Sequence, residues 1–249
     1  MPRKAREKSE SGIYHVMLRG INQQLILEDE EDNQKYLEIL KDCKAVSEYK
    51  LFAYCLMGNH IHLLMKVEKE SLEQIFKRIG GKFVYWYNGK YKRAGHLFQD
   101  RFKSEPVDDD RYFLTVIRYI HQNPIKANIV KKVSEYVYSS YNEYINPEND
   151  QLTDIDFVLD IIGKEEFIRF NNEYNDDKCL ELEESGYRVT DEQAKKVILK
   201  LTKCHNSAEF QELDIKIRDK YLRKLKEKGL SIRQISRLTG VSFGIARKS

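Results

Sequence analysis

The fold of this 249-residue chain is decided by the stretch Leu51-Phe-Ala-Tyr-Cys-Leu-Met-Gly-Asn-His-Ile-His-Leu-Leu-Met-Lys-Val67. Two apolar runs flank the pair Gly58-Asn59, which suits a tight turn between two strands. The pattern predicts a β-hairpin in which residues 51–57 pair with residues 60–67. This hairpin supplies two adjacent antiparallel strands to which the flanking segments can add.

The second strand of the hairpin carries two histidines on one face. His60 and His62 lie two residues apart, and side chains alternate along a strand, so their imidazoles point the same way. Ile61, Leu63 and Met65 point the other way, toward a core. An imidazole pair on a strand is a ready site for a divalent metal, because neither ring has to reach around the backbone. The alternative is two half-buried histidines that are hydrogen-bonded within the sheet.

The segments around the hairpin alternate between strand and helix patterns. Residues 13–19 alternate and are rich in β-formers, which predicts a strand. Apolar residues at helical spacing predict a helix over residues 30–49. Ser71 begins a capping-box pattern and a helix that ends at Tyr87, and residues 97–107 supply an edge strand. This order predicts an α+β fold, a ferredoxin-like antiparallel sheet with helices on one face.

The chain beyond the sheet is expected to be helical. Carboxylates favour the start of a helix, so Asp108-Asp-Asp-Arg111 predicts one, and Pro124 is expected to break or restart it. Thr190 is the expected cap of the third of four later helices. These four helices are predicted over residues 155–162, 164–173, 191–203 and 209–228.

The end of the chain has the pattern of a helix-turn-helix. Ser231 is the expected cap of a short helix, Gly240 makes the turn, and Ser242 caps a second helix. A generic pair of antiparallel helices has the same pattern, but the basic segment favours DNA binding. The turn-rich residues 146–150 suggest a domain boundary. We therefore expect a first domain over 1–146, an acidic helical linker region over 147–208, and a basic helix-turn-helix tail over 209–249.

The formal net charge is only +3, but it is unevenly distributed. Residues 148–192 hold 15 acidic and 4 basic side chains, whereas residues 214–249 hold 11 basic and 3 acidic ones. Residues 77–103 hold 8 basic and 1 acidic side chain. Two basic regions separated by an acidic one favour a polyanionic partner that contacts the chain at two places. The alternative is a set of ordinary solvated helix faces.

The cysteines and the hydropathy point to an intracellular protein. Cys43, Cys55, Cys179 and Cys204 form no C-x-x-C pair, and the chain starts without a signal-peptide pattern. We expect free thiols in a reducing cytoplasm. Apolar runs are too short for a membrane span, so we expect no membrane association.

A further polar group is Arg118-Tyr-Ile-His-Gln-Asn-Pro124. Tyrosine, with an unperturbed pKa of about 10, is a sluggish nucleophile at neutral pH, but a divalent metal can polarise a phosphate that the phenol attacks. On a continuous helix Tyr119 and Asn123 share a face, so the amide oxygen can complete a metal shell begun by the two histidines. The alternatives are a core aromatic at Tyr119 and an N-cap at Asn123 before a proline.

Several separated blocks carry a family resemblance. They are Gly58-Asn-His-Ile-His-Leu-Leu64, Gly95-His-Leu-Phe-Gln-Asp-Arg-Phe-Lys-Ser104 and Tyr119-Ile-His-Gln-Asn-Pro124, joined by Arg19-Gly20 and by Ala127-x-x-Val130. In this order and spacing they resemble the single-tyrosine HUH transposases of bacterial insertion sequences, especially the REP-associated tyrosine transposase branch. The resemblance covers residues 11–144.

The resemblance implies an enzyme that cuts single-stranded DNA next to hairpins, for transposition or REP-type processing. It implies a 5′-phosphotyrosine intermediate and a Mg²⁺ or Mn²⁺ ion. By position, His60 and His62 match the metal-binding histidine pair, and Tyr119 matches the nucleophile. Asn123 stands where the insertion-sequence proteins usually have Gln and where the REP-associated branch tends to have Asn, so it is the expected third ligand.

Other residues are expected to bind DNA. The candidates are Arg19, Gln99, Arg101 and Lys103 in the first domain, with Arg233 and Arg237 in the tail. The tail is expected to contact duplex DNA, while the first domain binds single strands with hairpins. For Gln99, Arg101 and Lys103 the alternative is an exposed strand face. The sequence leaves both a monomer and a homodimer open.

Three functions compete at this stage. The first is a metal-dependent strand transferase that acts through Tyr119. The second is a catalytically silent, sequence-specific DNA-binding regulator that keeps the fold and the basic tail. The third is a hydrolytic nuclease that uses metal and water, and it predicts cleavage that survives Tyr119→Phe.

Overall fold

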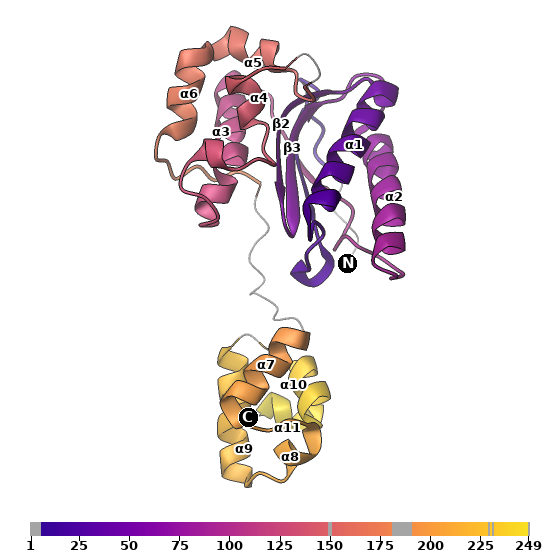
Figure 1. Ribbon diagram of the computed structural model, residues 1–249, viewed down its shortest axis with the longest axis vertical. Helices are drawn as coiled ribbons and strands as arrows, with labels where there is room; N and C mark the ends of the chain where they lie inside the picture. The colour runs from indigo at the N-terminus through magenta and orange to yellow at the C-terminus, as the bar shows by residue number, and fades with distance from the viewer. Residues whose placement is uncertain (1–5, 149–150, 181–190, 229, 231, 249) are drawn as a thin grey trace. The chain divides into compact units, whose positions relative to one another are not determined.

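The computed structural model describes residues 6–148, 151–180, 191–228, 230 and 232–248, and the chain forms two compact units (Figure 1). The first unit is Met1–Glu181 and the second is Leu182–Ser249. The predicted helix caps at Thr190 and Ser231 lie outside the described residues. None of the helices in these ranges combines the length and apolar character that crossing a bilayer requires.

The first unit is built on a four-stranded antiparallel sheet. Its strands are β1 (Ile13–Arg19), β2 (Lys50–Met57), β3 (His60–Lys66) and β4 (Lys103–Pro106), in the spatial order β2-β3-β1-β4. Helix α1 (Glu30–Ser47) joins β1 to β2, and α2 (Leu72–Lys90) lies between β3 and β4 in the chain. This β-α-β-β-α-β order confirms the predicted α+β sheet and its connections.

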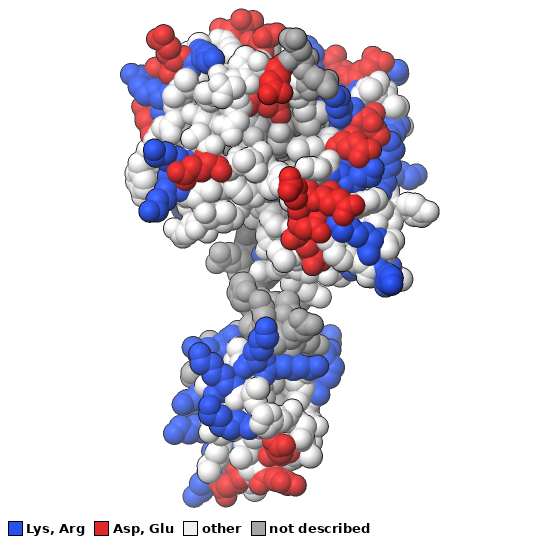
Figure 2. Space-filling model, viewed as in Figure 1, with Lys and Arg blue, Asp and Glu red and all other residues white. Residues whose placement is uncertain are grey.

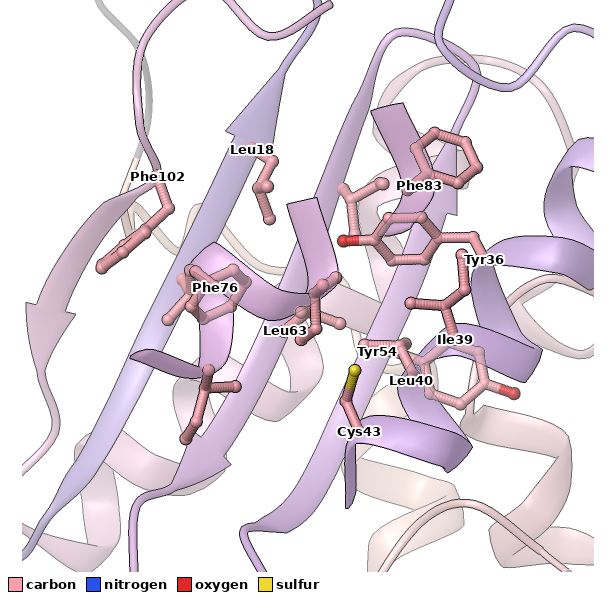
Figure 3. Close-up of a cluster of buried hydrophobic side chains, with 14 of the residues drawn as sticks. Leu18, Tyr36, Ile39, Leu40, Cys43, Tyr54, Leu63, Phe76, Phe83 and Phe102 are labelled. Atoms are coloured by element: carbon pink, nitrogen blue, oxygen red, sulfur yellow. The ribbon is translucent and has the colours of Figure 1, made fainter. Parts of the chain in front are cut away.

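The predicted hairpin is present, and its register sets the two faces of the sheet. Met57 pairs with His60 across the turn at Gly58-Asn59. Leu63 lies in the buried apolar cluster that the sheet forms with α1 and α2. Figure 3 shows Leu63 with Tyr36, which comes from α1, in this cluster. The prediction that Ile61, Leu63 and Met65 point toward a core is therefore confirmed.

Helices α1 and α2 both begin with a capping box. The side chains of Ser71 and Gln74 cap the start of α2 reciprocally, which confirms the predicted capping box. Asp29 and Asp32 form the same arrangement at the start of α1. The caps satisfy backbone N–H groups that have no partner within the helix.

A third long helix covers the opposite face of the sheet. Helix α3 (Asp110–Lys126) shares a buried cluster with Phe52 and Leu64, through residues that include Phe113 and Ile117. Figure 1 shows the sheet between α3 on one side and α1 and α2 on the other. The two helices of the predicted ferredoxin-like layer, α1 and α2, do lie on one face, but the prediction did not foresee that α3 covers the other face. Almost every residue of β2 is buried, and an apolar run of this kind needs cover on both faces.

The first unit extends beyond the predicted boundary at Asn146. Helices α4 (Tyr141–Ile145), α5 (Ile155–Ile162) and α6 (Lys164–Asn172) all belong to it. The ring of Phe157 in α5 lies 5.1 Å from that of Phe52, and the ring of Phe167 in α6 stacks on Tyr144 at 4.3 Å. Residues 151–172 are therefore part of this core, and their assignment to a linker is wrong. Asp156, Asp160 and Glu165, three of the acidic side chains that suggested a linker, lie on the exposed sides of these packed helices.

The second unit is a small helical body with its own apolar core. Its helices are α7 (Asp191–Thr202), α8 (Ser207–Gln211), α9 (Ile215–Glu227), α10 (Ile232–Thr239) and α11 (Phe243–Lys248). The core includes Ile198, Phe210, Leu222 and Ile235. The segment predicted as one helix over 209–228 is divided between α8 and α9, with Asp214 capping α9.

The predicted turn at Gly240 connects α10 to α11. Gly240 has a φ of +70°, and a Cβ at this position would lie 1.9 Å from Nε2 of Gln211. The positive φ favours glycine at this turn, whereas the contact is with the end of a flexible, exposed side chain that can move. The Ser242 hydroxyl accepts a hydrogen bond from the amide of Ile245 at 3.4 Å, as expected of a cap for α11.

Candidate active site

Three rings meet on the face of the sheet that α3 covers. His60 and His62 project from β3 with their ring centroids 5.1 Å apart. The ring of Tyr119, on α3, lies edge-on to His62 with the centroids 5.6 Å apart. Tyr119 and His62 are both buried, at 4% and 2% exposure, whereas His60 is half-buried. The structure thus brings together the two histidines and the tyrosine predicted from separate parts of the sequence.

Asn123 joins this group because α3 continues through Pro124. The helix ends at Lys126, so the predicted break at Pro124 is wrong: a proline in the last turn removes little of the hydrogen bonding. Asn123 therefore lies inside the helix and not at an N-cap. Its Nδ2 donates to the carbonyl oxygen of Tyr119 at 3.4 Å, and its Oδ1 faces Nε2 of His60, also at 3.4 Å.

The neighbours of His60 determine where its proton lies. The side-chain oxygen of Asn59 accepts a hydrogen bond from Nδ1 at 2.7 Å, which leaves the lone pair on Nε2. Burial lowers the pKa of His60 to about 4; the nearby Arg19 also lowers it, and the contact with Asn123 raises it. The ring is therefore neutral at pH 7. Nε2 of His60 and Oδ1 of Asn123 then present two lone pairs to each other, which is an arrangement that suits a bound cation.

The donor set fits a divalent metal. Burial lowers the pKa of His62 well below its ordinary value, helped by the neighbouring His15 and His60, so this ring is neutral as well. Within the described ranges, no group of three His, Cys, Asp or Glu side chains could hold a metal ion. Two imidazoles and the amide oxygen of Asn123 would thus be the protein's ligands for Mg²⁺ or Mn²⁺, with water and substrate oxygens completing the shell.

Two residues that the sequence did not assign to the site lie behind His62. Nε2 of His15 lies 3.0 Å from Nδ1 of His62, and Nδ1 of His15 lies 2.8 Å from Oε1 of Glu105. Burial tends to raise the pKa of Glu105, but hydrogen bonds from His15 and Tyr112 outweigh it and bring this pKa below its ordinary value. Glu105 is therefore ionised. Its only signal in the sequence is its place on an expected edge strand.

Comparisons with known proteins assign much of the first unit to a family. Residues 8–123 match the model of the family described as "Transposase IS200 like". Residues 8–123 belong to the IS200-like transposase family. A relative from Haemophilus influenzae (strain Rd), named "Putative REP-associated tyrosine transposase", is 29% identical over 112 residues, which are 40% of this chain and 63% of the relative. The chain thus spans less than two thirds of the length of that relative.

A solved structure gives the same fold for the transposase domain. It is a REP-associated tyrosine transposase bound to a REP hairpin, and it matches with a TM-score of 0.52 at 16% identity. The match covers 63% of this chain and 96% of that one. The family and branch inferred from the sequence blocks are confirmed.

Two of the predicted DNA-binding residues of the transposase domain flank its histidines. Arg19 pairs with His60 across β1 and β3, so both side chains lie on the same face of the sheet. Lys103 pairs with Met17, which in turn pairs with His62, and Lys103 is exposed on the edge strand. The two cationic side chains thus lie on the histidine face of the sheet.

The other two predicted residues of this domain lie apart from the histidines. Arg101 lines a cavity of about 320 Å³ together with Phe76 and Lys77 of α2, on the opposite layer of the domain. The backbone amide of Gln99 donates to the carbonyl oxygen of Arg19 at 2.8 Å, and its side chain is exposed. Contacts of Gln99 and Arg101 with DNA stay predictions.

The two predicted arginines of the tail and a third histidine of the first unit, His121, lie outside the site. Arg233 and Arg237 are exposed on α10 of the second unit. His121 of α3, two residues after Tyr119, is fully buried, with Nδ1 2.9 Å from Oδ1 of Asn171 and Nε2 2.8 Å from the Ser140 hydroxyl. His121 therefore belongs to the core of the transposase domain.

Proposed function

We propose that the chain cuts and rejoins single-stranded DNA through Tyr119, as a metal-dependent transposase of the REP-associated type. The observation that carries this proposal is the packing of the Tyr119 ring against His62, with Asn123 of the same helix facing Nε2 of His60. A bound Mg²⁺ or Mn²⁺ ion would polarise the scissile phosphate. His60, His62 and Asn123 would hold that ion.

Tyr119 supplies the nucleophile. Its phenolic oxygen attacks phosphorus, the bond from phosphorus to the 3′ oxygen breaks, and the phenolic proton passes to solvent. The products are a 5′-phosphotyrosine and a free 3′ hydroxyl, and attack by a 3′ hydroxyl on the link restores a phosphodiester without ATP. The ammonium of Lys126 lies 4.7 Å from the centroid of the Tyr119 ring, which favours the negative charge that develops on the phenol.

The substrate we propose is a single strand next to a hairpin. Arg19 and Lys103 flank the histidines and can neutralise backbone phosphates there. The REP hairpin bound to the solved relative supports the same substrate class for this chain. Transposition and REP-type hairpin processing both require cutting and rejoining at such a structure.

We further propose that the second unit binds duplex DNA through a helix-turn-helix made of α10 and α11. Residues 214–249 carry 11 basic and 3 acidic side chains, and Figure 2 shows Lys and Arg over much of the visible face of this unit. Arg233 and Arg237 lie on α10, four residues apart and exposed. They would contact phosphates beside the groove that the second helix of the pair enters.

A covalent-adduct assay tests the proposed activity. The full chain is incubated with Mn²⁺ and a labelled single strand that carries a hairpin, and the products are separated under denaturing conditions. We expect a protein–DNA adduct from the parent and none from Tyr119→Phe, which removes only the phenolic oxygen and keeps the ring packing. Tyr85→Phe is the matched control, because Tyr85 is 86% exposed on α2 and should be as active as the parent.

The same assay separates the competing functions. Cleavage by Tyr119→Phe without an adduct would indicate a hydrolytic nuclease. DNA binding by the parent without cleavage or adduct would indicate a silent regulator. An adduct formed by Tyr119→Phe would assign the nucleophile to another tyrosine and overturn the role given to Tyr119.

A further inference from the structure

The carboxylate of Glu105 is held by donors from three parts of the first unit. Its Oε1 lies 2.8 Å from Nδ1 of His15, accepts from the Tyr112 hydroxyl at 2.8 Å, and accepts from the amide of Leu180 at 2.9 Å. Tyr112 lies on α3, and Leu180 follows α6 in the chain. Glu105 is thus fixed in place as a hydrogen-bond acceptor.

His15 connects this carboxylate to the candidate metal site. It is fully buried, its ring centroid lies 5.2 Å from that of His62, and its Nε2 lies 3.0 Å from Nδ1 of His62. Its other nitrogen contacts Glu105. Both ring nitrogens of His15 are therefore used, one toward the carboxylate and one toward the histidine that faces Tyr119.

The sheet itself sets these distances. His15 and Glu105 are directly opposite each other in the pairing of β1 with β4, and β1 also pairs with β3, which carries His62. Directly opposite residues in an antiparallel pair lie on the same face. The three side chains therefore form a row across three adjacent strands, on the same rigid element that holds the histidine pair.

We propose that Glu105 and His15 are positioning residues that hold the proton of His62 on Nδ1, so that its Nε2 carries the lone pair. This proposal rests on the proposed function, in which His62 is a metal ligand. In it, Nδ1 of His62 donates to Nε2 of His15, and Nδ1 of His15 donates to Glu105.

The chemistry of neutral imidazole gives this order of protons. A neutral ring has one donor nitrogen and one acceptor nitrogen. The carboxylate of Glu105 accepts hydrogen bonds from the Tyr112 hydroxyl and the Leu180 amide, so Nδ1 of His15 donates to it as well. If Nε2 of His62 is to bind the metal, Nδ1 of His62 must carry the proton and Nε2 of His15 must accept it. The proton between the two rings then belongs to Nδ1 of His62. A histidine that binds a metal commonly donates its second N–H to a carboxylate, and here an imidazole relays that contact.

Nitrogen NMR on the full chain, labelled with ¹⁵N-histidine, tests the proton positions directly. At neutral pH, with and without Mg²⁺, we expect His15 and His62 each to carry one proton, on Nδ1. A proton on Nε2 of His62, or protons on both nitrogens of His15, would overturn the proposal. This measurement does not depend on cleavage.

Metal binding by variants tests the consequence. His15→Gln keeps a side chain that can donate to Glu105 and accept from His62, whereas His15→Leu can do neither. We expect His15→Leu and Glu105→Ala to weaken Mn²⁺ binding by roughly 10- to 100-fold, the usual effect of losing an outer partner of a metal ligand. His15→Gln should recover most of that loss in calorimetry with Mn²⁺.

His121 supplies the matched control. Like His15 it is fully buried and contacts polar partners through both ring nitrogens, but its partners are Asn171 and Ser140. His121→Leu should lower the melting temperature as His15→Leu does, yet leave the Mn²⁺ affinity unchanged. Equal Mn²⁺ affinity in the parent, His15→Leu and Glu105→Ala would overturn the role of the row.

The outcomes keep this proposal apart from the proposed function. If the parent forms no DNA adduct but the proton positions and the Mn²⁺ effects are as expected, the positioning role of Glu105 and His15 is supported and the proposed transferase activity is contradicted. If the parent forms the adduct and the variants bind Mn²⁺ as the parent does, the transferase activity is supported and the positioning role of Glu105 and His15 is contradicted.

Discussion

The two faces of the sheet contain the same strands but differ in chemistry. On the face covered by α1 and α2, Ile61, Leu63 and Met65 of β3 are buried among apolar side chains. On the face covered by α3, His60 and His62 alternate with them and meet a row of polar groups. Because side chains alternate along β3, its core residues and its candidate metal ligands lie on opposite faces of the sheet. Substitutions at neighbouring positions of β3 should therefore have different kinds of effect.

The largest expected effect is loss of metal binding and cleavage in His60→Ala. His60 is half-buried and its neutral ring presents Nε2 to Asn123, so its removal deletes a ligand but leaves no large hole in the core. We expect the Mn²⁺ affinity to fall by more than roughly 100-fold, which is the upper end of the loss caused by removing a residue that only contacts a metal ligand. The unfolding free energy should change by less than about 1 kcal/mol. Calorimetry, the adduct assay and urea unfolding measure the three quantities.

Leu63→Ala, three residues along the same strand, is the opposite case and the control. Leu63 is completely buried on the core face, so truncation should cost about 2–5 kcal/mol of unfolding free energy. Mn²⁺ affinity of the folded protein should stay within a factor of a few. A large loss of metal affinity in Leu63→Ala, or a large loss of stability in His60→Ala, would break the division between the faces.

A smaller effect is expected on the pH dependence of folding stability, through the buried His121 of α3. Burial lowers its pKa to about 4, opposed by the hydrogen bond with Asn171, whereas the unfolded chain has an ordinary pKa near 6.5. Above pH 6.5 the ring is neutral in both states. As the pH falls from 6.5 to 4, the unfolded chain takes up the proton first, so folding stability decreases. The expected loss is on the order of 3 kcal/mol.

Unfolding of the parent and of His121→Gln across this pH range measures that contribution. The difference in unfolding free energy between the two proteins should move in favour of the variant as the pH falls below 6.5. Comparing the two removes the contributions of His60 and His62, which are shared. A constant difference from pH 7.5 to pH 4.5 would show that His121 does not titrate as its burial implies.

The sequence predicted the elements that have a local signal. The hairpin around Gly58-Asn59, the capping box at Ser71 and the strand at residues 13–19 follow from spacing over a few residues, and the structure has all three. The histidine pair and Tyr119 came from chemistry and from the family resemblance, and the structure brings them together. Their roles in catalysis stay predictions.

What the sequence missed depends on contacts between distant segments. The row of Glu105 and His15 requires the register of β1 against both β3 and β4, which no local pattern specifies. Helices α5 and α6 looked like an acidic linker because their charged residues outnumber the few rings, such as Phe157 and Phe167, that dock them on the first unit. The run of α3 through Pro124 placed Asn123 beside His60, although proline usually marks a break.

The smallest expected effect is a change in duplex DNA binding by the second unit. Arg233→Ala combined with Arg237→Ala removes two exposed cations from α10 without disturbing the core of Ile235. If both side chains contact phosphates, binding to duplex DNA should weaken, and the log–log slope of affinity against salt should flatten by about two. Adduct formation on a short hairpin strand should stay unchanged.

The control is Arg111→Ala with Lys131→Ala, which removes the same charge from exposed positions of the first unit. An unchanged salt slope in the α10 variant, or an equal change in the control, would remove the support for a DNA-binding helix-turn-helix.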